Sequence, residues 1–250
     1  MKNIITISIF FICSITFAQQ TILENSWTIF SRDSIINTKL ETSLNNFLTE
    51  TNKGNYNIKY IDQNHLKKNK YFYEEFEQIT NSRYFKDSVF FKPQLLKSVV
   101  DKNQDYYLTI QYIGVNEEKP ITNTILKFKA TPKDDYYQFF CLFDENTVNW
   151  KSKVNDGITF YYSTNYNEEK ANKFVKFHRN LEKLTKQSSP IKNYYKCKNT
   201  QEALEIFGIQ FALRSANSGS GFGMSDDYGN FITGINSEDY LHDYVHSFFG

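Results

Sequence analysis

The sequence has 250 residues, of which 40% are hydrophobic and 17% aromatic, with 4 prolines. This composition excludes a disordered chain and is sufficient for one large domain or two small ones. Twenty-nine basic and 28 acidic residues leave a formal net charge of +1, and no basic stripe is present that could follow a phosphate backbone. The sequence therefore predicts no nucleic-acid partner.

Residues 1–18 have the pattern of a secretory signal peptide. A lysine precedes an apolar stretch over residues 4–17, and Thr16 and Ala18 lie three and one residues before a cleavage site ahead of Gln19. A transmembrane anchor is the alternative, but the stretch is shorter than the roughly 20 apolar residues that a span requires. We expect a secreted or periplasmic protein without a membrane span.

Three cysteines are present, and Cys13 would be removed with the leader. An oxidising compartment would permit Cys141 and Cys197 to pair. The sequence leaves open whether they form a disulfide or remain free.

Residues 19–153 predict an α+β module in which helices precede a β-meander. Leu40, Leu44 and Phe47 recur at helical spacing, and a second helix is expected over residues 67–79. Runs rich in β-branched and aromatic residues predict strands at 88–91, 106–115, 124–130 and 136–143. No catalytic constellation occurs here, so we interpret this part as a packing or binding module.

The polar segment 151–157 is a predicted domain boundary, and residues 154–250 form the second predicted part. Strands are expected at 158–163 and 191–197, with a long helix between them. A short helix follows, opened by Thr200 and closed at Gly208. Residues 215–230, rich in glycine and serine, are interpreted as a surface loop rather than a phosphate-binding loop, because such loops open a helix.

His178 lies on the apolar stripe of the long predicted helix. A buried, hydrogen-bonded histidine is common in such a position, and we prefer this interpretation to a metal ligand.

The final predicted helix carries two histidines. A strand is expected over residues 230–235, and Asn236 or Ser237 would then cap a helix with acidic residues in its first turn. His242 and His246 are four residues apart, which places them on one helical face. Both rings could therefore bind one zinc ion.

The motif HDYVH, residues 242–246, resembles the HExxH motif of zincin metallopeptidases, with Asp243 in place of the glutamate. The last hundred residues are similar to the front half of gluzincin-like peptidase domains of secreted Bacteroidetes proteins. This resemblance implies that residues 230–235 are the edge strand of a mixed sheet that lines a peptide-binding cleft. It also implies that His242 and His246 are the first two zinc ligands, and that Asp243 is the general base.

Two departures from the family pattern affect the expected activity. An aspartate is one methylene shorter than a glutamate, and a carboxylate displaced by about 1 Å can lower the rate on the order of a hundredfold. Gluzincins take their third ligand from a glutamate on a later helix, whereas the sequence continues for four residues after His246. Asp239 is an alternative third ligand, although we prefer to interpret it as an acid of the first helical turn.

The sequence therefore predicts a secreted zinc metallopeptidase-like protein that acts on a peptide or protein substrate. We expect it to be an incomplete or degenerate form that is inactive as this 250-residue chain. The alternative is a non-catalytic secreted binding protein whose N-terminal module carries the function.

Overall fold

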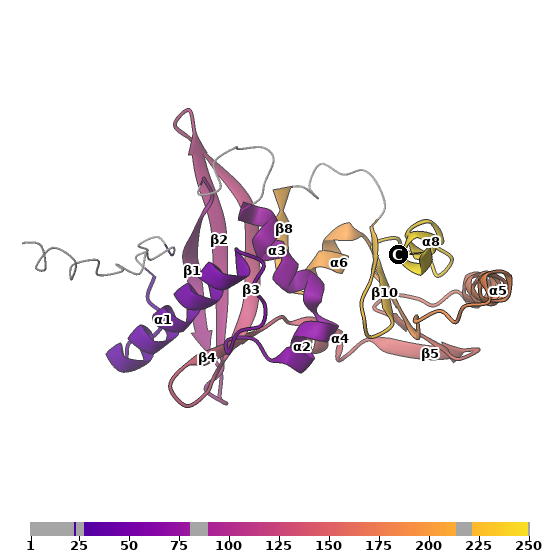
Figure 1. Ribbon diagram of the computed structural model, residues 1–250, viewed down its shortest axis with the longest axis horizontal. Coiled ribbons are helices and arrows are strands. Elements are labelled where there is room, and N and C mark those ends of the chain that lie inside the picture. Colours follow the sequence, from indigo (N-terminus) through magenta and orange to yellow (C-terminus); the bar gives the residue numbers. More distant parts are fainter. Residues whose placement is uncertain (1–22, 24–27, 81–89, 214–221, 250) are drawn as a thin grey trace, which may run out of the picture.

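The computed structural model describes residue 23 and residues 28–80, 90–213 and 222–249. Two five-stranded sheets lie side by side, each with helices packed against one face (Figure 1). The predicted α+β class is confirmed. The predicted signal peptide lies outside the described residues.

The first sheet is an antiparallel meander in the order β1-β2-β3-β4, and β8 also pairs with β3. Its strands are β1 (Lys92–Val100), β2 (Tyr106–Asn116), β3 (Lys119–Pro132), β4 (Tyr137–Phe140) and β8 (Ile209–Ala212). In β2, buried and half-buried side chains alternate from Tyr106 to Gly114, which is the pattern of a strand with one face toward a core.

Helices α1 (Ser34–Thr51) and α3 (Lys70–Thr80) cover one face of this sheet (Figure 1). The helix predicted around Leu40 is confirmed as α1, and the Asp33 side chain caps it by accepting hydrogen bonds from two backbone amides. The prediction of one helix over residues 67–79 is wrong. Asn69 leaves the helical conformation (φ −128°, ψ 29°) and separates α2 (Gln63–Lys68) from α3.

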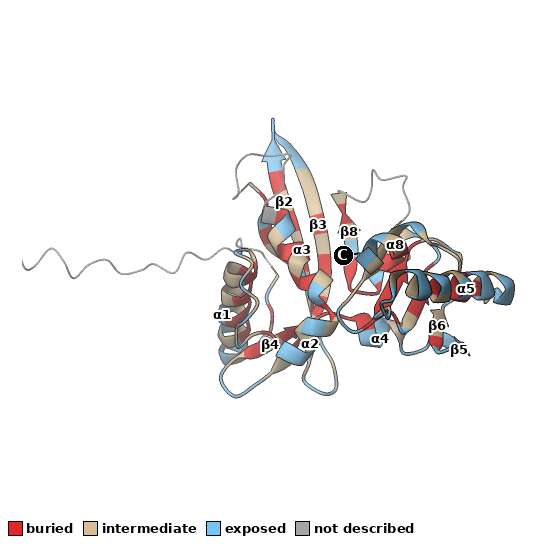
Figure 2. Cartoon of the chain, turned by 45° about the vertical axis from the view of Figure 1, so that its right-hand side comes forward, coloured by how far each residue is buried: buried red, intermediate tan, exposed pale blue. Residues whose placement is uncertain are grey.

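An aromatic core fills the space between these helices and the first sheet. Figure 2 colours the buried residues of these elements red. The Phe47 ring lies 4.7 Å from Phe139 and 5.1 Å from Phe76, measured between centroids. Each such side chain contributes roughly 1.5–3 kcal/mol when it is fully buried. Burial of aromatic rings therefore holds α1 and α3 on the sheet.

The second sheet is mixed, in the order β5-β6-β7-β10-β9. Its strands are β5 (Lys151–Asn155), β6 (Ile158–Tyr162), β7 (Asn193–Lys196), β9 (Gly223–Ser225) and β10 (Asn230–Thr233). The three inner strands are parallel, and the two outer strands are antiparallel to their neighbours.

Helices α5 (Glu168–Thr185) and α8 (His242–Phe249) pack on one face of the second sheet around a separate core. The long helix predicted in this part is confirmed by α5, and the strands predicted at 158–163, 191–197 and 230–235 are confirmed by β6, β7 and β10. The structure also describes two short helices, α4 (Phe143–Thr147) and α6 (Thr200–Glu205). The N-cap of α6 is Asn199 rather than Thr200.

Three strand predictions need correction. Residues 90 and 91 are a bend, so the predicted strand at 88–91 is wrong where it is described, and β1 starts at Lys92. The segment 151–155, predicted as part of a linker, is β5, which Asp156 and Gly157 join to β6 with φ angles of 44° and 83°. Positive φ at both central residues is the geometry of a type I′ hairpin turn. The strand predicted over 136–143 ends at Phe140, where the chain turns into α4.

The two sheets share the first core. Strand β8 follows the predicted boundary in sequence, yet it pairs with β3 of the first sheet. Buried residues Cys197 and Leu204 also belong to the first core. The second part of the chain therefore packs into the first.

Candidate functional site

Helix α8 is held on the second sheet by Tyr244, which is completely buried. The Tyr244 hydroxyl is 2.7 Å from Nδ1 of His178 on α5, and its ring meets the Phe174 ring edge-on at 4.9 Å. His178 is 2% exposed, which confirms the prediction of a buried, hydrogen-bonded histidine, and burial lowers its pKa.

The segment before α8 is fixed by a buried ion pair. Glu238 Oε1 lies 2.7 Å from Lys196 Nζ on β7 and accepts a hydrogen bond from the backbone N–H of Asn167 at 2.9 Å. The Tyr194 hydroxyl donates to the Ser237 carbonyl at 2.8 Å. The prediction that a helix starts at Asn236 or Ser237 is wrong, because Glu238 turns inward to Lys196 and α8 begins at His242.

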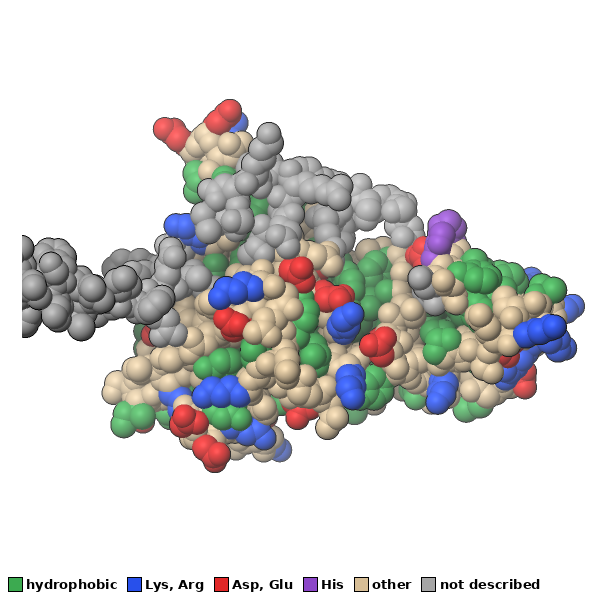
Figure 3. Space-filling model, viewed as in Figure 1, with side chains coloured by type: hydrophobic (Ala, Val, Ile, Leu, Met, Phe, Trp, Pro, Cys, Tyr) green, Lys and Arg blue, Asp and Glu red, His purple; other side chains and the backbone are tan. Residues whose placement is uncertain are grey.

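The two predicted zinc ligands lie together on the first two turns of α8. The centroids of the His242 and His246 rings are 5.0 Å apart, with an interplanar angle of 75°. The His242 side chain is 74% exposed, and His246 is also exposed. Figure 3 shows histidine side chains at the surface over α8. Both rings can therefore be reached from solvent.

Asp243 lies beside this pair and is oriented by a tyrosine. Its Oδ2 accepts a hydrogen bond from the Tyr240 hydroxyl at 2.8 Å, and its Oδ1 lies 3.8 Å from Nε2 of His242. Burial and this hydrogen bond raise the pKa of Tyr240 to about 12. The phenol therefore stays protonated at neutral pH and remains a donor to Asp243.

Strand β9 passes directly beside Asp243. A Cβ atom at Gly223 would lie 2.7 Å from Asp243 Cβ and 2.9 Å from Cε1 of Tyr240, so the close approach requires glycine. The expectation that residues 230–235 form the edge strand is wrong. Strand β10 pairs on both sides, with β7 and β9, so β9 is the outer strand on that side of the sheet among the described residues.

A third ligand is not found in the part of the chain that the structure describes, where no group of three or more His, Cys, Asp or Glu side chains could hold a metal ion. Asp239 accepts a hydrogen bond from the Ser237 hydroxyl and lies 4.0 Å from Lys170 Nζ. Its predicted role as an acid of the first helical turn is wrong, because α8 starts three residues later.

No protein-family model, curated protein or solved structure matches this chain. Within the described ranges, no helix has the length and apolar character needed to cross a membrane.

Sequence reasoning missed two features of the site. The first is the contact between Tyr240 and Asp243. Side chains three residues apart meet on a helix, so the helix predicted over this segment would have indicated this contact. The Glu238–Lys196 pair had no such signal, because its two residues are far apart in the sequence and meet only through β7.

Proposed function

We propose that this protein is a secreted zinc metallopeptidase-like protein in which His242 and His246 bind the metal. The proposal rests on one observation, two solvent-exposed imidazole rings one helical turn apart with centroids 5.0 Å from each other. Imidazole nitrogens are preferred zinc ligands, and this separation suits one ion bound by both rings.

In a zinc site completed by a third ligand, Asp243 would act as the proton acceptor in peptide hydrolysis. A bound zinc ion would lower the pKa of a water molecule and polarise the peptide carbonyl. The Tyr240 hydroxyl holds Oδ2 of Asp243, and Oδ1 lies on the side of His242. This orientation places one carboxylate oxygen of Asp243 toward the histidine pair, where it could accept a proton from the attacking water.

The proposed substrate is an extended peptide or protein segment. Strand β9 lies next to α8 and is one of the two outer strands described in the second sheet. Extended peptides bind such strands through backbone hydrogen bonds. A peptide added to β9 would pass close to Asp243.

A catalytic zinc site requires three protein ligands and a water molecule. The described residues bring two histidines together, so we expect the 250-residue chain to bind zinc weakly and to lack peptidase activity.

Zinc binding tests this proposal. Equilibrium dialysis with metal analysis should give measurable zinc binding to the whole chain, and His242→Ala or His246→Ala should each weaken it at least about tenfold. The matched control is Lys176→Ala, which changes an exposed side chain on α5. Zinc affinity that is unchanged in both histidine variants would contradict the proposal, as would cleavage of a mixed peptide library that persists without the histidines.

The alternative proposal is a non-catalytic secreted binding protein whose N-terminal module carries the function. It is favoured by a preformed groove in that module, lined by α1 and the β3–β4 turn. Absence of zinc binding by the unaltered chain would favour this alternative.

A further inference from the structure

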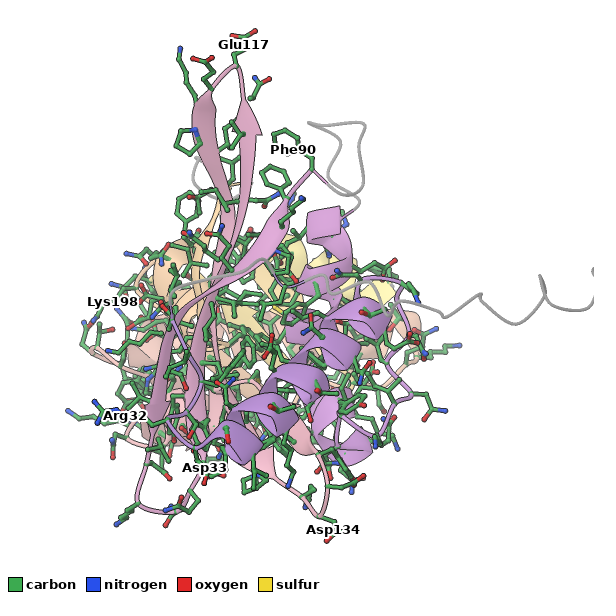
Figure 4. All side chains as sticks on the ribbon, turned by 90° about the vertical axis from the view of Figure 1, so that its left-hand side faces the viewer. Arg32, Asp33, Phe90, Glu117, Asp134 and Lys198 are labelled. Carbon is green, nitrogen blue, oxygen red and sulfur yellow. The ribbon has the colours of Figure 1, made fainter. Side chains whose placement is uncertain are left out.

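A groove of about 800 Å³ follows α1 on the first module, far from the histidine pair in sequence. Figure 4 shows α1 crossing in front of the first sheet, with Asp33 at the helix start and Asp134 at the β3–β4 turn at the same end of the module. The groove lies between this helix, the segment at residues 59–60 and the turn at residues 135–136.

One wall of the groove is a row of polar side chains on α1, called the ladder below, which can donate or accept hydrogen bonds. Ser34, Thr38, Thr42 and Asn46 line it at intervals of four residues, which places them on one helical face. At 1.5 Å per residue this ladder is about 18 Å long. Within the described part of the chain, the hydroxyls of Ser34, Thr38 and Thr42 make no hydrogen bond, so they remain available to a ligand.

The opposite wall presents two tyrosine rings and a lysine. The Tyr60 and Tyr136 rings meet edge-on at 5.9 Å, and Lys59 Nζ lies 4.6 Å from the centroid of Tyr136. Both rings are half-buried, so part of each ring reaches the groove.

Hydrogen bonds across the groove keep its walls in place. Lys39 Nζ donates to the carbonyls of Lys133 and Asp134 at 2.9 and 2.7 Å, which joins α1 to the β3–β4 turn. Farther along the helix, the Asn46 amide donates to the Tyr60 hydroxyl at 3.0 Å. The groove is therefore preformed, which lowers the entropy cost of binding a ligand.

We propose that this groove binds a short oligosaccharide. Hydroxyls both donate and accept hydrogen bonds, so a row of them matches the hydroxyl-rich edge of a sugar chain. Tyrosine rings offer a flat apolar surface to the C–H face of a sugar, beside a polar hydroxyl. Side chains four residues apart on a helix are about 6 Å apart along its axis, which is comparable with the length of one pyranose residue, so successive side chains can meet successive sugars.

A peptide fits the groove less well. Ile35 is the one aliphatic side chain among the described lining residues, so the groove has no series of apolar pockets for alternate peptide side chains. The proposal is independent of the zinc site.

The test is binding of the whole chain to a microarray of neutral and uronate-containing oligosaccharides, with calorimetric titration of the sugars that bind. Thr38→Val/Thr42→Val removes two hydroxyls of the ladder at nearly constant shape, and Tyr136→Ala removes one ring. We expect each variant to weaken sugar binding at least about tenfold, which corresponds to 1.4 kcal/mol.

Matched controls lie outside the groove. Thr122→Val changes a half-buried threonine on β3, and Tyr228→Ala removes a tyrosine that is 44% exposed. Both should retain wild-type sugar affinity, and circular dichroism should show that every variant is folded. The proposal is overturned if no sugar on the array binds, if the groove variants bind as the wild type does, or if peptide probes bind in the groove instead.

Discussion

Glu238 and Lys196 form an ion pair of 2.7 Å in which the two side chains are 2% and 3% exposed. This pair joins the segment before α8 to the middle of the second sheet. Because Glu238 points inward to Lys196, the chain is not helical at this position, and α8 begins at His242.

Removal of one partner of this pair should destabilise the protein strongly. We expect Glu238→Gln or Lys196→Met to lower the free energy of unfolding by about 3–5 kcal/mol, because each leaves a buried group without its charged partner. Urea denaturation measures the change. The double variant Lys196→Met/Glu238→Leu should recover part of the lost stability, because it leaves no unpaired charge. The control Lys173→Ala removes the exposed ion pair with Glu169 and should have little effect. Two single variants as stable as the wild type would contradict this assignment.

Stability should decrease as the pH falls below about 6.5. Burial lowers the pKa of His65 to about 4 from an ordinary value of 6.5, so the unfolded chain takes up a proton before the folded chain does. The loss of stability begins near the pKa of His65 in the unfolded chain, 6.5, and is complete below its pKa in the folded protein, about 4. With allowance for the partial exposure of His65, we expect a loss on the order of 2 kcal/mol.

The variant His65→Phe isolates this contribution. It keeps a ring against Tyr73 and Phe140 and removes the titrating group. Urea denaturation between pH 7 and pH 4 should give a shallower pH dependence for this variant than for the wild type, and identical slopes would show that His65 is not responsible.

Substitution at Gly223 should disturb the contact between β9 and α8. We expect Gly223→Ala to lower the free energy of unfolding by about 1–3 kcal/mol, because the added methyl would lie 2.7 Å from Asp243 Cβ. Thermal or urea denaturation measures it, with Ser225→Ala in the same strand as the control. An unchanged stability would mean that β9 and α8 lie farther apart than described.

Both cysteines of the predicted mature chain should be free thiols. Cys141 and Cys197 are unpaired and buried, and burial raises the pKa of each thiol. A thiol reagent should therefore react slowly with the folded protein and rapidly with both residues in denaturant without reductant. If denaturation alone exposes no thiol, the two cysteines are paired and this prediction is wrong.

Export should remove the leader. The lysine, apolar stretch and Thr-Phe-Ala end of residues 1–18 predict cleavage before Gln19. Mass spectrometry of protein recovered from the medium or periplasm should find this N-terminus. Exported protein that still begins at Met1 would contradict the prediction.

Elements with a local signal could be predicted from the sequence alone. Apolar residues at helical spacing predicted α1 and α5, because packing on a sheet requires one continuous apolar stripe. The four-residue spacing of His242 and His246 likewise placed both rings on one face once a helix formed.

Features that depend on residues distant in the sequence could not be predicted in this way. The polar segment 151–155 forms β5 because it pairs with β6, to which a two-residue turn connects it. Glu238 left the expected first turn because Lys196, 42 positions earlier, neutralises it inside the protein. Strand β9 took the place predicted for β10 at the sheet edge, and glycine at residue 223 allows it to approach Asp243. Local periodicity cannot predict such contacts, because their free energy comes from groups that folding alone brings together.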